Sequence, residues 1–341
     1  MIYYKTANKK NEIILKSISI IKMSLNYFKK ANILCEEILS VILSKNIYIN
    51  RKDLLITTNE ILNVFIKEQN IFSIGYPLCI SLNNETEYFC DFNDNTIIKE
   101  NDLVKFEFGL SFELKGRVYY YTFGETILNG KVEKTCKKIK TSLIKELNEL
   151  TLTQEEYDDE EEKDIEYIMT NDEISNTICD VYSKNHVHSL LNITSYVQEN
   201  GVMKDNNAKY IKVNYRRHND DYKDNFCMDL ENKDVYSLRL LFTKNDIIKE
   251  PIIKSTTLYS LNNFHVSLKL KMQKKAQQQL HKLYKNNVFN SSNLPDDIKS
   301  YGFNSLINTG ILTEYPCSVC EENVYSIKMT LIIENDKIYL L

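Results

Sequence analysis

The sequence contains little glycine and proline and no tryptophan. Among its 341 residues there are 8 Gly and 4 Pro, which is too few for long flexible linkers, a collagen-like repeat or a low-complexity tail. Hydrophobic residues make up 43% of the chain, enough to build one continuous core. We therefore expect residues 1–341 to form a single domain.

The sequence also lacks long apolar segments. It has no stretch of about 18 uncharged apolar residues, and residues 1–10 lack the features of a signal peptide. These absences predict a soluble intracellular protein. The eight cysteines are scattered along the chain, which indicates free thiols in a reducing compartment. The one close pair, Cys317 and Cys320, has no second pair or histidines at the spacing that a structural zinc site needs.

Common catalytic motifs are absent as well. The chain has no Gly-x-Ser-x-Gly, GxGxxG, P-loop or HExxH motif, which argues against the enzyme classes that depend on them. Of the five histidines, only His186 and His188 lie close together in the sequence. Because no acidic or cysteine partner is near them, the pattern favours an ordinary pair of histidines over a pair of metal ligands.

The formal charge of −4 is unevenly distributed. Residues 155–164 (EEYDDEEEKD) have a net charge of −7, so the rest of the chain is net positive by 3. The run favours a solvated, self-repelling insertion at residues 154–166. The alternatives are a calcium site or a contact for a basic partner. The segment lacks the glycine and the alternating ligands of a calcium loop.

Hydrophobic periodicity predicts an α+β layout. Helical spacing occurs over 24–45 and 50–69, which form an N-terminal helical region within residues 1–70, and again over 134–150, 172–184, 263–286 and a segment after Pro295. Runs of β-branched and aromatic residues predict strands over 77–83, 103–112, 117–127, 209–216, 235–243, 256–261, 324–333 and 337–341. Lys115 and Gly116 give a hairpin signal. We expect a curved antiparallel sheet covered by helices.

Several segments resemble a known family. Ile97–Phe123 (IIKENDLVKFEFGLSFELKGRVYYYTF) is similar to the core hairpin of the creatinase and methionine aminopeptidase family, and Gly75–Asn84 (GYPLCISLNN) is similar to the segment before it. Motifs beginning at Val235, Tyr315 and Tyr325 follow in the family's order. The likeness extends over nearly the whole chain. It is greatest for the proliferation-associated branch, the non-peptidase relatives of type 2 methionine aminopeptidases, and it implies the pita-bread fold.

The resemblance also implies where a metal site would lie. Active members hold two divalent metals with two Asp, one His and two Glu, and a second His lines the substrate pocket. Anionic oxygens offset the charge of such metals and lower the pKa of the attacking water. In this sequence the five metal positions and the pocket position fall on Glu107, Tyr120, Asn192, Arg239, Lys328 and, for the pocket, Tyr88. Since Arg and Lys are cations, we expect no metal, no other cofactor and no peptidase activity.

The loss of the metals predicts an ion pair in their place. A buried charge is tolerable only when it is paired, because an isolated one costs several kcal/mol. We therefore expect Glu107 to accept a charge-assisted hydrogen bond from Arg239 or Lys328. Tyr88 and Tyr120 are expected to fill the remaining volume, with their hydroxyl groups bonded to this cluster or to water.

The resemblance implies a partner. Members of the proliferation-associated branch associate with ribosomes and RNA, in the cytoplasm or nucleus. Basic side chains bind phosphate groups, and the candidates here are Lys269, Lys271, Lys274, Lys275, Lys282, Lys285, Arg216 and Arg217. An ordinary solvated helix face would explain the lysines equally well.

We therefore expect a monomer that binds the large ribosomal subunit or structured RNA, possesses no membrane segment and acts in ribosome biogenesis or translation. Two other functions stay open on the sequence alone. One is a peptide- or protein-binding module that uses the former substrate cleft. The other is a residual metal-dependent methionine aminopeptidase.

Overall fold

The computed structural model describes most of the chain, and its described residues are 25–153, 171–190, 195–199, 202–204, 211, 235–245, 251–262, 268–285, 287–299, 301–334 and 337–341. The acidic segment 154–166 lies outside this part, as does the predicted strand 209–216 apart from Ile211. Within the described residues, no helix is both long enough and apolar enough to cross a membrane.

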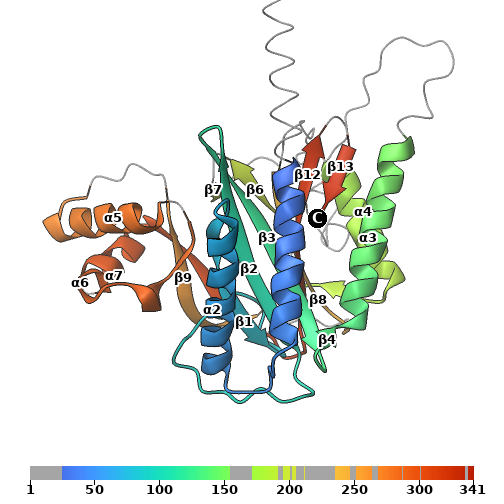
Figure 1. Cartoon of the computed structure of the whole chain (residues 1–341), viewed down its shortest axis with the longest axis horizontal. Coiled ribbons are helices and arrows are strands. Elements are labelled where there is room, and N and C mark those ends of the chain that lie inside the picture. The colour runs from blue at the N-terminus through green and yellow to red at the C-terminus, as the bar shows by residue number, and fades with distance from the viewer. Residues whose placement is uncertain are drawn as a thin grey trace, which may run out of the picture.

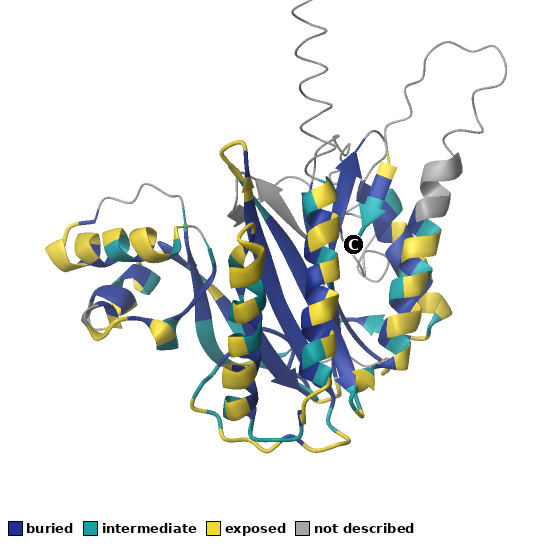
Figure 2. Ribbon diagram, in the orientation of Figure 1, coloured by how far each residue is buried: buried dark blue, intermediate teal, exposed yellow. Residues whose placement is uncertain are grey.

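Two helices at the start of the described chain cover one part of a large sheet (Figure 1). The first spans residues 25–43, and the second, α2, spans Arg51–Gln69. The side chain of Asn50 caps α2 by accepting a hydrogen bond from the Lys52 amide, and Asn70 ends it in the left-handed conformation (φ 52°). Both helices bury one apolar side against the sheet and expose the other (Figure 2).

The strands of the large sheet pair in antiparallel fashion in the order β1-β2-β3-β12-β8-β6-β7. A tight hairpin joins β2 and β3 through Lys115 and Gly116, both at positive φ (51° and 77°), as a two-residue hairpin turn requires. The predicted hairpin is therefore confirmed. The bounds of these strands are β1 Ser73–Leu82, β2 Val104–Leu114, β3 Arg117–Leu128, β6 Ser195–Glu199, β7 Val202–Lys204, β8 Val235–Thr243 and β12 Tyr325–Glu334.

Short strands and a second pair of helices complete this body. The helices α3 (Lys134–Thr153) and α4 (Asn171–Lys184) pack against β8 and β12. The strand β13 (Lys337–Leu340) pairs with β12, β4 (Lys131–Val132) with β3, and β5 (His188–Ser189) with β8. In Figure 1 the helices α3 and α4 lie at the right of the large sheet, away from β1. The sheet is therefore covered by helices, as predicted.

The two faces of the large sheet differ in chemistry. Side chains alternate between faces along a strand, and on β2 the even-numbered Phe106, Phe108 and Leu110 belong to the core under the helices. On β12 the odd-numbered Ile327 and Met329 do the same. The alternate residues of these strands therefore point to the face opposite the helices. That face carries the polar and charged residues Lys105, Glu107, Ser111, Ser326, Lys328 and Thr330.

A separate small sheet was not predicted. Its order is β10-β9-β11, with β9 at Ile252–Leu261, β10 at Phe289–Asn290 and β11 at Leu312–Val319. The 3₁₀ turn η3 (Ser291–Asn293) follows β10, and the helices α5 (Lys271–Tyr284), α6 (Asp296–Lys299) and α7 (Tyr301–Asn308) pack around a core of their own. Strand β11 was not predicted because its eight residues include Pro316 and do not alternate regularly between polar and apolar. The expected helix 263–286 begins, among the described residues, at Lys271.

Lys105 is a fully buried charged residue of the large sheet. Its side chain has no exposed surface, and its ammonium donates to the carbonyl oxygens of Asn83 (2.8 Å) and Val324 (3.1 Å). Burial lowers the pKa of Lys105 to about 8, although the charges of Glu85 and Glu107 oppose this effect. The buried environment of Lys105 therefore stabilises the neutral amine, relative to the ammonium, more than water does.

We expect Lys105 to make a contribution to stability that rises with pH. The folded-state pKa of about 8 lies below the unfolded value, so the folded state loses this proton first. The contribution of Lys105 to the unfolding free energy should increase by about 2 kcal/mol between pH 7 and 9.5. Burial also raises the pKa of thiols such as those of Cys35 and Cys136, which lowers stability over the same pH range. Urea unfolding should therefore show the rise as the difference between the wild type and Lys105→Met. Replacing the exposed Lys99 by Met is the control. The same pH dependence in the Lys105→Met and Lys99→Met variants would refute the assignment.

Candidate functional site

Four strands bring their residues into one row on the polar face of the large sheet. Glu107 on β2 pairs with Gly124 on β3, Gly124 pairs with Lys328 on β12, and Lys328 pairs with Arg239 on β8. Residues that pair directly across a sheet point to the same face. The register therefore places the side chains of Glu107, Lys328 and Arg239 side by side. Three positions that the resemblance assigned to a metal site do meet in one place.

The cationic and anionic side chains of this row form a buried network with Glu87. The ammonium of Lys328 lies 2.5 Å from Glu107 Oε2 and 3.0 Å from Glu87 Oε2. Arg239 Nη1 lies 2.6 Å from Glu87 Oε1. The predicted contact of Glu107 with a cation is therefore present, through Lys328. We refer to Glu87, Glu107, Arg239 and Lys328 as the ionic quartet, which has two positive and two negative charges.

The ionic quartet is shielded from water. Glu107 has no exposed surface, and the side chains of Glu87 and Lys328 are each 5% exposed. Burial alone would lower the pKa of Lys328, but the charges of Glu107 and Glu87 outweigh it and raise that pKa above its ordinary value. The ammonium therefore stays charged. Burial raises the pKa of Glu107, Lys328 opposes this and Glu87 adds to it.

Sequence analysis did not identify Glu87. It lies outside the strands, in the segment that returns from β1, and no motif of the resemblance includes it. The one available signal is its position next to Tyr88, which was assigned to the pocket. Since an acidic residue beside a pocket residue is common on protein surfaces, only the structure shows that Glu87 is buried and joins both cations.

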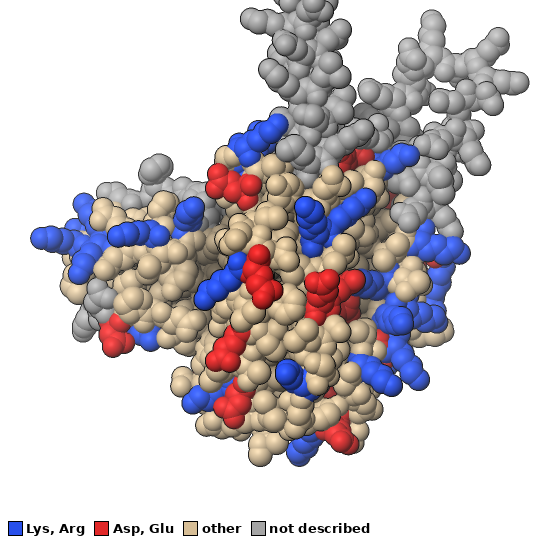
Figure 3. Space-filling view, in the orientation of Figure 1, with Lys and Arg blue, Asp and Glu red and all other residues tan. Residues whose placement is uncertain are grey.

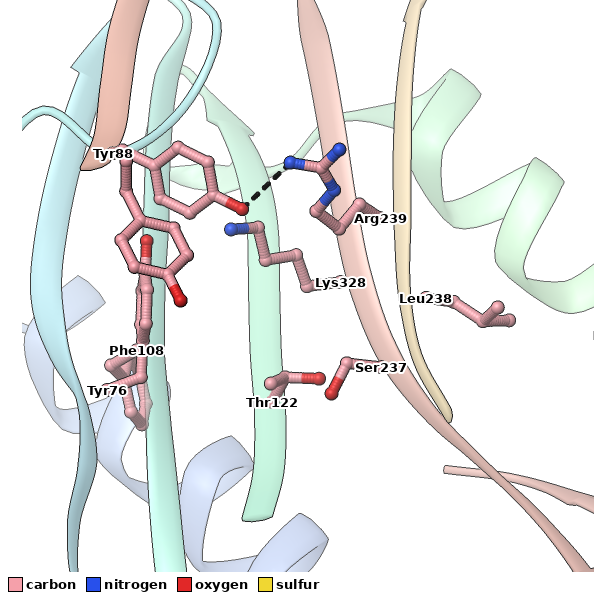
Figure 4. A pocket seen from close by; sticks show the side chains of 9 residues that line it. Tyr76, Tyr88, Phe108, Thr122, Ser237, Leu238, Arg239 and Lys328 are labelled. Atoms are coloured by element: carbon pink, nitrogen blue, oxygen red, sulfur yellow. Dashed lines mark hydrogen bonds between the residues drawn. The ribbon is translucent and has the colours of Figure 1, made fainter. Parts of the chain in front are cut away.

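Tyr88 lies against the ionic quartet, as predicted. Its backbone has a positive φ of 67°, a conformation that costs energy for a non-glycine residue. In this conformation its amide donates to Glu107 Oε1 (3.2 Å) and its hydroxyl accepts a hydrogen bond from Arg239 (2.9 Å). Its ring centroid is 4.1 Å from the Lys328 ammonium, close enough for a cation–π contact (Figure 4).

Tyr120 does not belong to this cluster, which corrects the expectation. The residue opposite Glu107 on β3 is Gly124, and Tyr120 pairs with Ser111. Four residues separate the two positions, about 13 Å along a strand. The Tyr120 hydroxyl instead donates to Asn287 (2.6 Å). The expected register was wrong because β2 and β3 remain paired up to the two-residue turn. The residue of β3 that lies opposite Glu107 is therefore four positions after Tyr120.

Gly124 makes room for the lysine. A Cβ atom at this position would lie 3.0 Å from Lys328 Cβ and Cγ and 3.2 Å from the Lys328 amide nitrogen. A side chain at residue 124 would therefore press on Lys328. The absence of a side chain at Gly124 thus allows Lys328 to pack directly on β3.

The outcome for the other predicted residues differs from one to the next. Asn192, Arg216 and Arg217 are outside the described residues. His188 pairs with Thr243 through β5, away from the row at residue 239. The six lysines at the start of the small-sheet region lie on or beside α5 and are exposed: Lys269, Lys271, Lys274, Lys275, Lys282 and Lys285.

A small cavity adjoins the ionic quartet (Figure 4). Its volume of about 10 Å³ is near the minimum that holds one water molecule. Tyrosine rings close it, with centroids 5.8 Å apart for Tyr76 and Tyr88 and 5.5 Å apart for Tyr88 and Tyr315. The lining residues are Tyr76, Tyr88, Phe108, Thr122, Ser237, Leu238, Arg239, Tyr315 and Lys328. The cavity thus has room for about one water molecule.

The residues of the row do not suit a pair of divalent metals. Among the described residues, no three His, Cys, Asp or Glu side chains are grouped closely enough to hold a metal ion. Both carboxylates of the ionic quartet are already bonded to cations. A divalent ion would have to lie beside Arg239 and Lys328, whose charges repel it.

Comparison with known proteins supports the fold. No protein-family model matches the sequence, and no curated protein matches it either. A solved structure of a thermophilic Arx1 matches with a TM-score of 0.68 at 16% identity, covering 93% of this chain and 89% of that one. A methionine aminopeptidase from Rickettsia prowazekii matches with a TM-score of 0.51 at 11% identity, covering 94% and 96%. This chain has the pita-bread fold. The fold expected from the sequence is thus confirmed.

We expect Glu107 and Lys328 to be strongly coupled in stability. Glu107→Gln and Lys328→Met should each lower the unfolding free energy by about 3 kcal/mol, because each leaves a buried charge with too few partners. The double variant keeps the neutral pair of Glu87 with Arg239. It should therefore lose less than the sum of the single variants, with a coupling energy of about 2 kcal/mol.

The exposed pair of Lys184 and Glu146 is the matched control for this cycle. Its atoms are 2.6 Å apart, but the two side chains are 60% and 28% exposed. Lys184→Met and Glu146→Gln should therefore be coupled by no more than about 0.5 kcal/mol. Urea unfolding measures all six variants. Additive losses at Glu107 and Lys328 would contradict the buried network.

Proposed function

We propose that this protein is a non-catalytic member of the aminopeptidase fold that binds a macromolecular partner. The observation that carries the proposal is the position of the Lys328 ammonium, which lies between Glu87 and Glu107 within 3.0 Å of both. A protein cation thus occupies the place where carboxylates would otherwise hold a metal. The network needs no added ion, since its charges sum to zero.

Catalysis by this site would need a large rearrangement. Water activation in such enzymes depends on a metal that lowers the pKa of bound water. To admit that metal, Lys328 would have to leave two carboxylates and Arg239 would have to leave Glu87. Each buried charge would then lose its partner at a cost of several kcal/mol. The cavity would also have to widen beyond the size of one water molecule.

The partner that we propose is RNA, in the ribosome or in another folded form. The exposed lysines on and beside α5 give a concentration of positive charge at one end of the molecule (Figure 3). Lys271 and Lys285 are about 21 Å apart along a helical rise of 1.5 Å per residue. Lysines arranged along one helix can neutralise several phosphates, which releases counterions and makes binding depend on salt.

A protein partner is the second candidate, and one observation favours it. The same helix region exposes the apolar side chains of Leu270, Met272 and Leu283, at 60%, 56% and 54% of their surface. Exposed apolar side chains among the lysines are typical of a surface that binds another protein. Binding that persists at high salt and after ribonuclease treatment would favour this candidate over RNA.

We expect the purified protein to hold less than one equivalent of divalent metal. It should also leave Met-initiated peptides intact when Co²⁺ or Mn²⁺ is added, because Arg239 and Lys328 repel metal. Elemental analysis and a peptide-release assay measure these properties, and the Rickettsia methionine aminopeptidase is the positive control. Stoichiometric metal together with turnover would overturn the proposal that the protein is not an enzyme.

We expect the protein to bind structured RNA or large ribosomal subunits in a salt-dependent way. The double variant Lys274→Glu, Lys275→Glu should bind at least tenfold more weakly, with a salt slope smaller by about 2. The control is Lys29→Glu, Lys30→Glu, which makes the same charge change at two exposed lysines of helix 25–43. Co-sedimentation at several salt concentrations measures both. Equal weakening by the two variants would show that net charge, and not α5, determines binding.

A further inference from the structure

A second group of exposed lysines surrounds the start of α3. Lys131 lies in β4, and Lys134, Lys137 and Lys138 lie in the first turns of the helix. All four are exposed, and the first turn of α3 contains no acidic residue. We call these four residues the α3 lysine surface.

Nearby carboxylates do not neutralise the α3 lysine surface. Glu133 is buried and accepts hydrogen bonds from the Cys136 amide (3.0 Å) and the Thr135 hydroxyl (3.1 Å). Its charge is paired with Lys244, at 3.4 Å. Glu125 is also buried and binds Lys140 at 2.7 Å. Within the described part of the chain, the four lysines form no ion pair.

The four lysines of this surface raise the free energy of the unbound protein. Positive charges repel one another, and lysines near the N-terminal end of a helix also face the positive end of its dipole. The repulsion is relieved when a partner supplies negative charges at several points. Because the four lysines are separate points on an exposed surface, a polyanion with regularly spaced charges fits them better than a single small anion.

The α3 lysine surface and the α5 lysines lie at opposite ends of the molecule. In Figure 3 blue side chains gather at the left over α5 and at the right over α3, with acidic side chains between them. The two helices belong to different units, since α5 packs on the small sheet and α3 on the large one. A chain of this length has a diameter of roughly 50 Å.

We propose that the α3 lysine surface is a second RNA-binding surface, so that the protein contacts RNA phosphates at two separated places. The inference rests on the proposed RNA-binding function and adds a second contact to it. An RNA long enough to reach both ends, or two helices of one folded RNA, then binds more tightly than a short duplex. Each surface contributes its own share of the salt dependence.

The test measures binding of the full-length protein to duplex RNAs of about 30 and about 8 base pairs, the first longer and the second shorter than the molecule. The variants are Lys137→Glu, Lys138→Glu and Lys274→Glu, Lys275→Glu, with Lys29→Glu, Lys30→Glu as the control. For the long duplex, each of the first two should weaken binding at least tenfold and reduce the salt slope by about 2. For the short duplex, the α3 variant should weaken binding by no more than about threefold, since the α5 lysines remain.

The outcomes separate the two proposals. If the α5 variant weakens binding and the α3 variant matches the control, the second surface is refuted and the proposed function stands. If the wild type binds neither duplex, both proposals fail. Binding of vesicles rich in phosphatidylserine that the α3 variant loses, with RNA binding unchanged, would assign the α3 lysine surface to lipid and overturn the inference. Matching thermal unfolding of all variants confirms that these exposed substitutions leave the fold intact.

Discussion

The ammonium of Lys328 between two buried carboxylates is the interaction on which this site depends. It joins Glu107 on β2 to Glu87 in the segment after β1, and Arg239 on β8 joins the same Glu87. The network thereby ties the edge of the sheet to its middle. Removing any one member leaves an unbalanced charge in a region that excludes water. Charge balance, more than any single hydrogen bond, fixes the composition of this site.

The segment that carries Glu87 also holds the two sheets together. Glu85, two residues earlier, binds Arg51 at the start of α2 and Lys254 on β9, each at 2.5 Å. Burial would raise the pKa of Glu85, but these two cations lower it. The Thr86 amide donates to Ser318 on β11 (2.8 Å). One short segment therefore connects the large sheet, the helix α2 and the small sheet. Such a connection needs no metal.

The ionic quartet has the position in the fold that a metal site would have, but not the charges that a metal site needs. The polar face of the large sheet is retained, as is the row of residues across β2, β3, β12 and β8. The charges in that row are of mixed sign, so the face cannot concentrate positive ions as a metalloenzyme must. Binding to a partner would then use the outer helices, where exposed lysines lie on α5 and α3. The two proposals agree in placing function outside the row of Glu107, Arg239 and Lys328.

Periodicity and the family resemblance predicted much of this structure. The hairpin of β2 and β3 and the positions of Glu107, Arg239 and Lys328 follow from motifs within regular strands, where alternation fixes which face each residue occupies. Tyr120 was misplaced because the register across a hairpin depends on how far the pairing continues toward the turn. Glu87 was missed because a loop has no period from which burial can be read. The small sheet was missed because β11 contains Pro316 and pairs with a strand distant in sequence.

The most direct test of the account is a crystal structure of the protein grown with excess Mn²⁺, with anomalous scattering data. The account predicts that the Lys328 ammonium lies within hydrogen-bond distance of both Glu87 and Glu107 and that the site shows no anomalous peak. A manganese peak between these carboxylates, with Lys328 turned away, would contradict it.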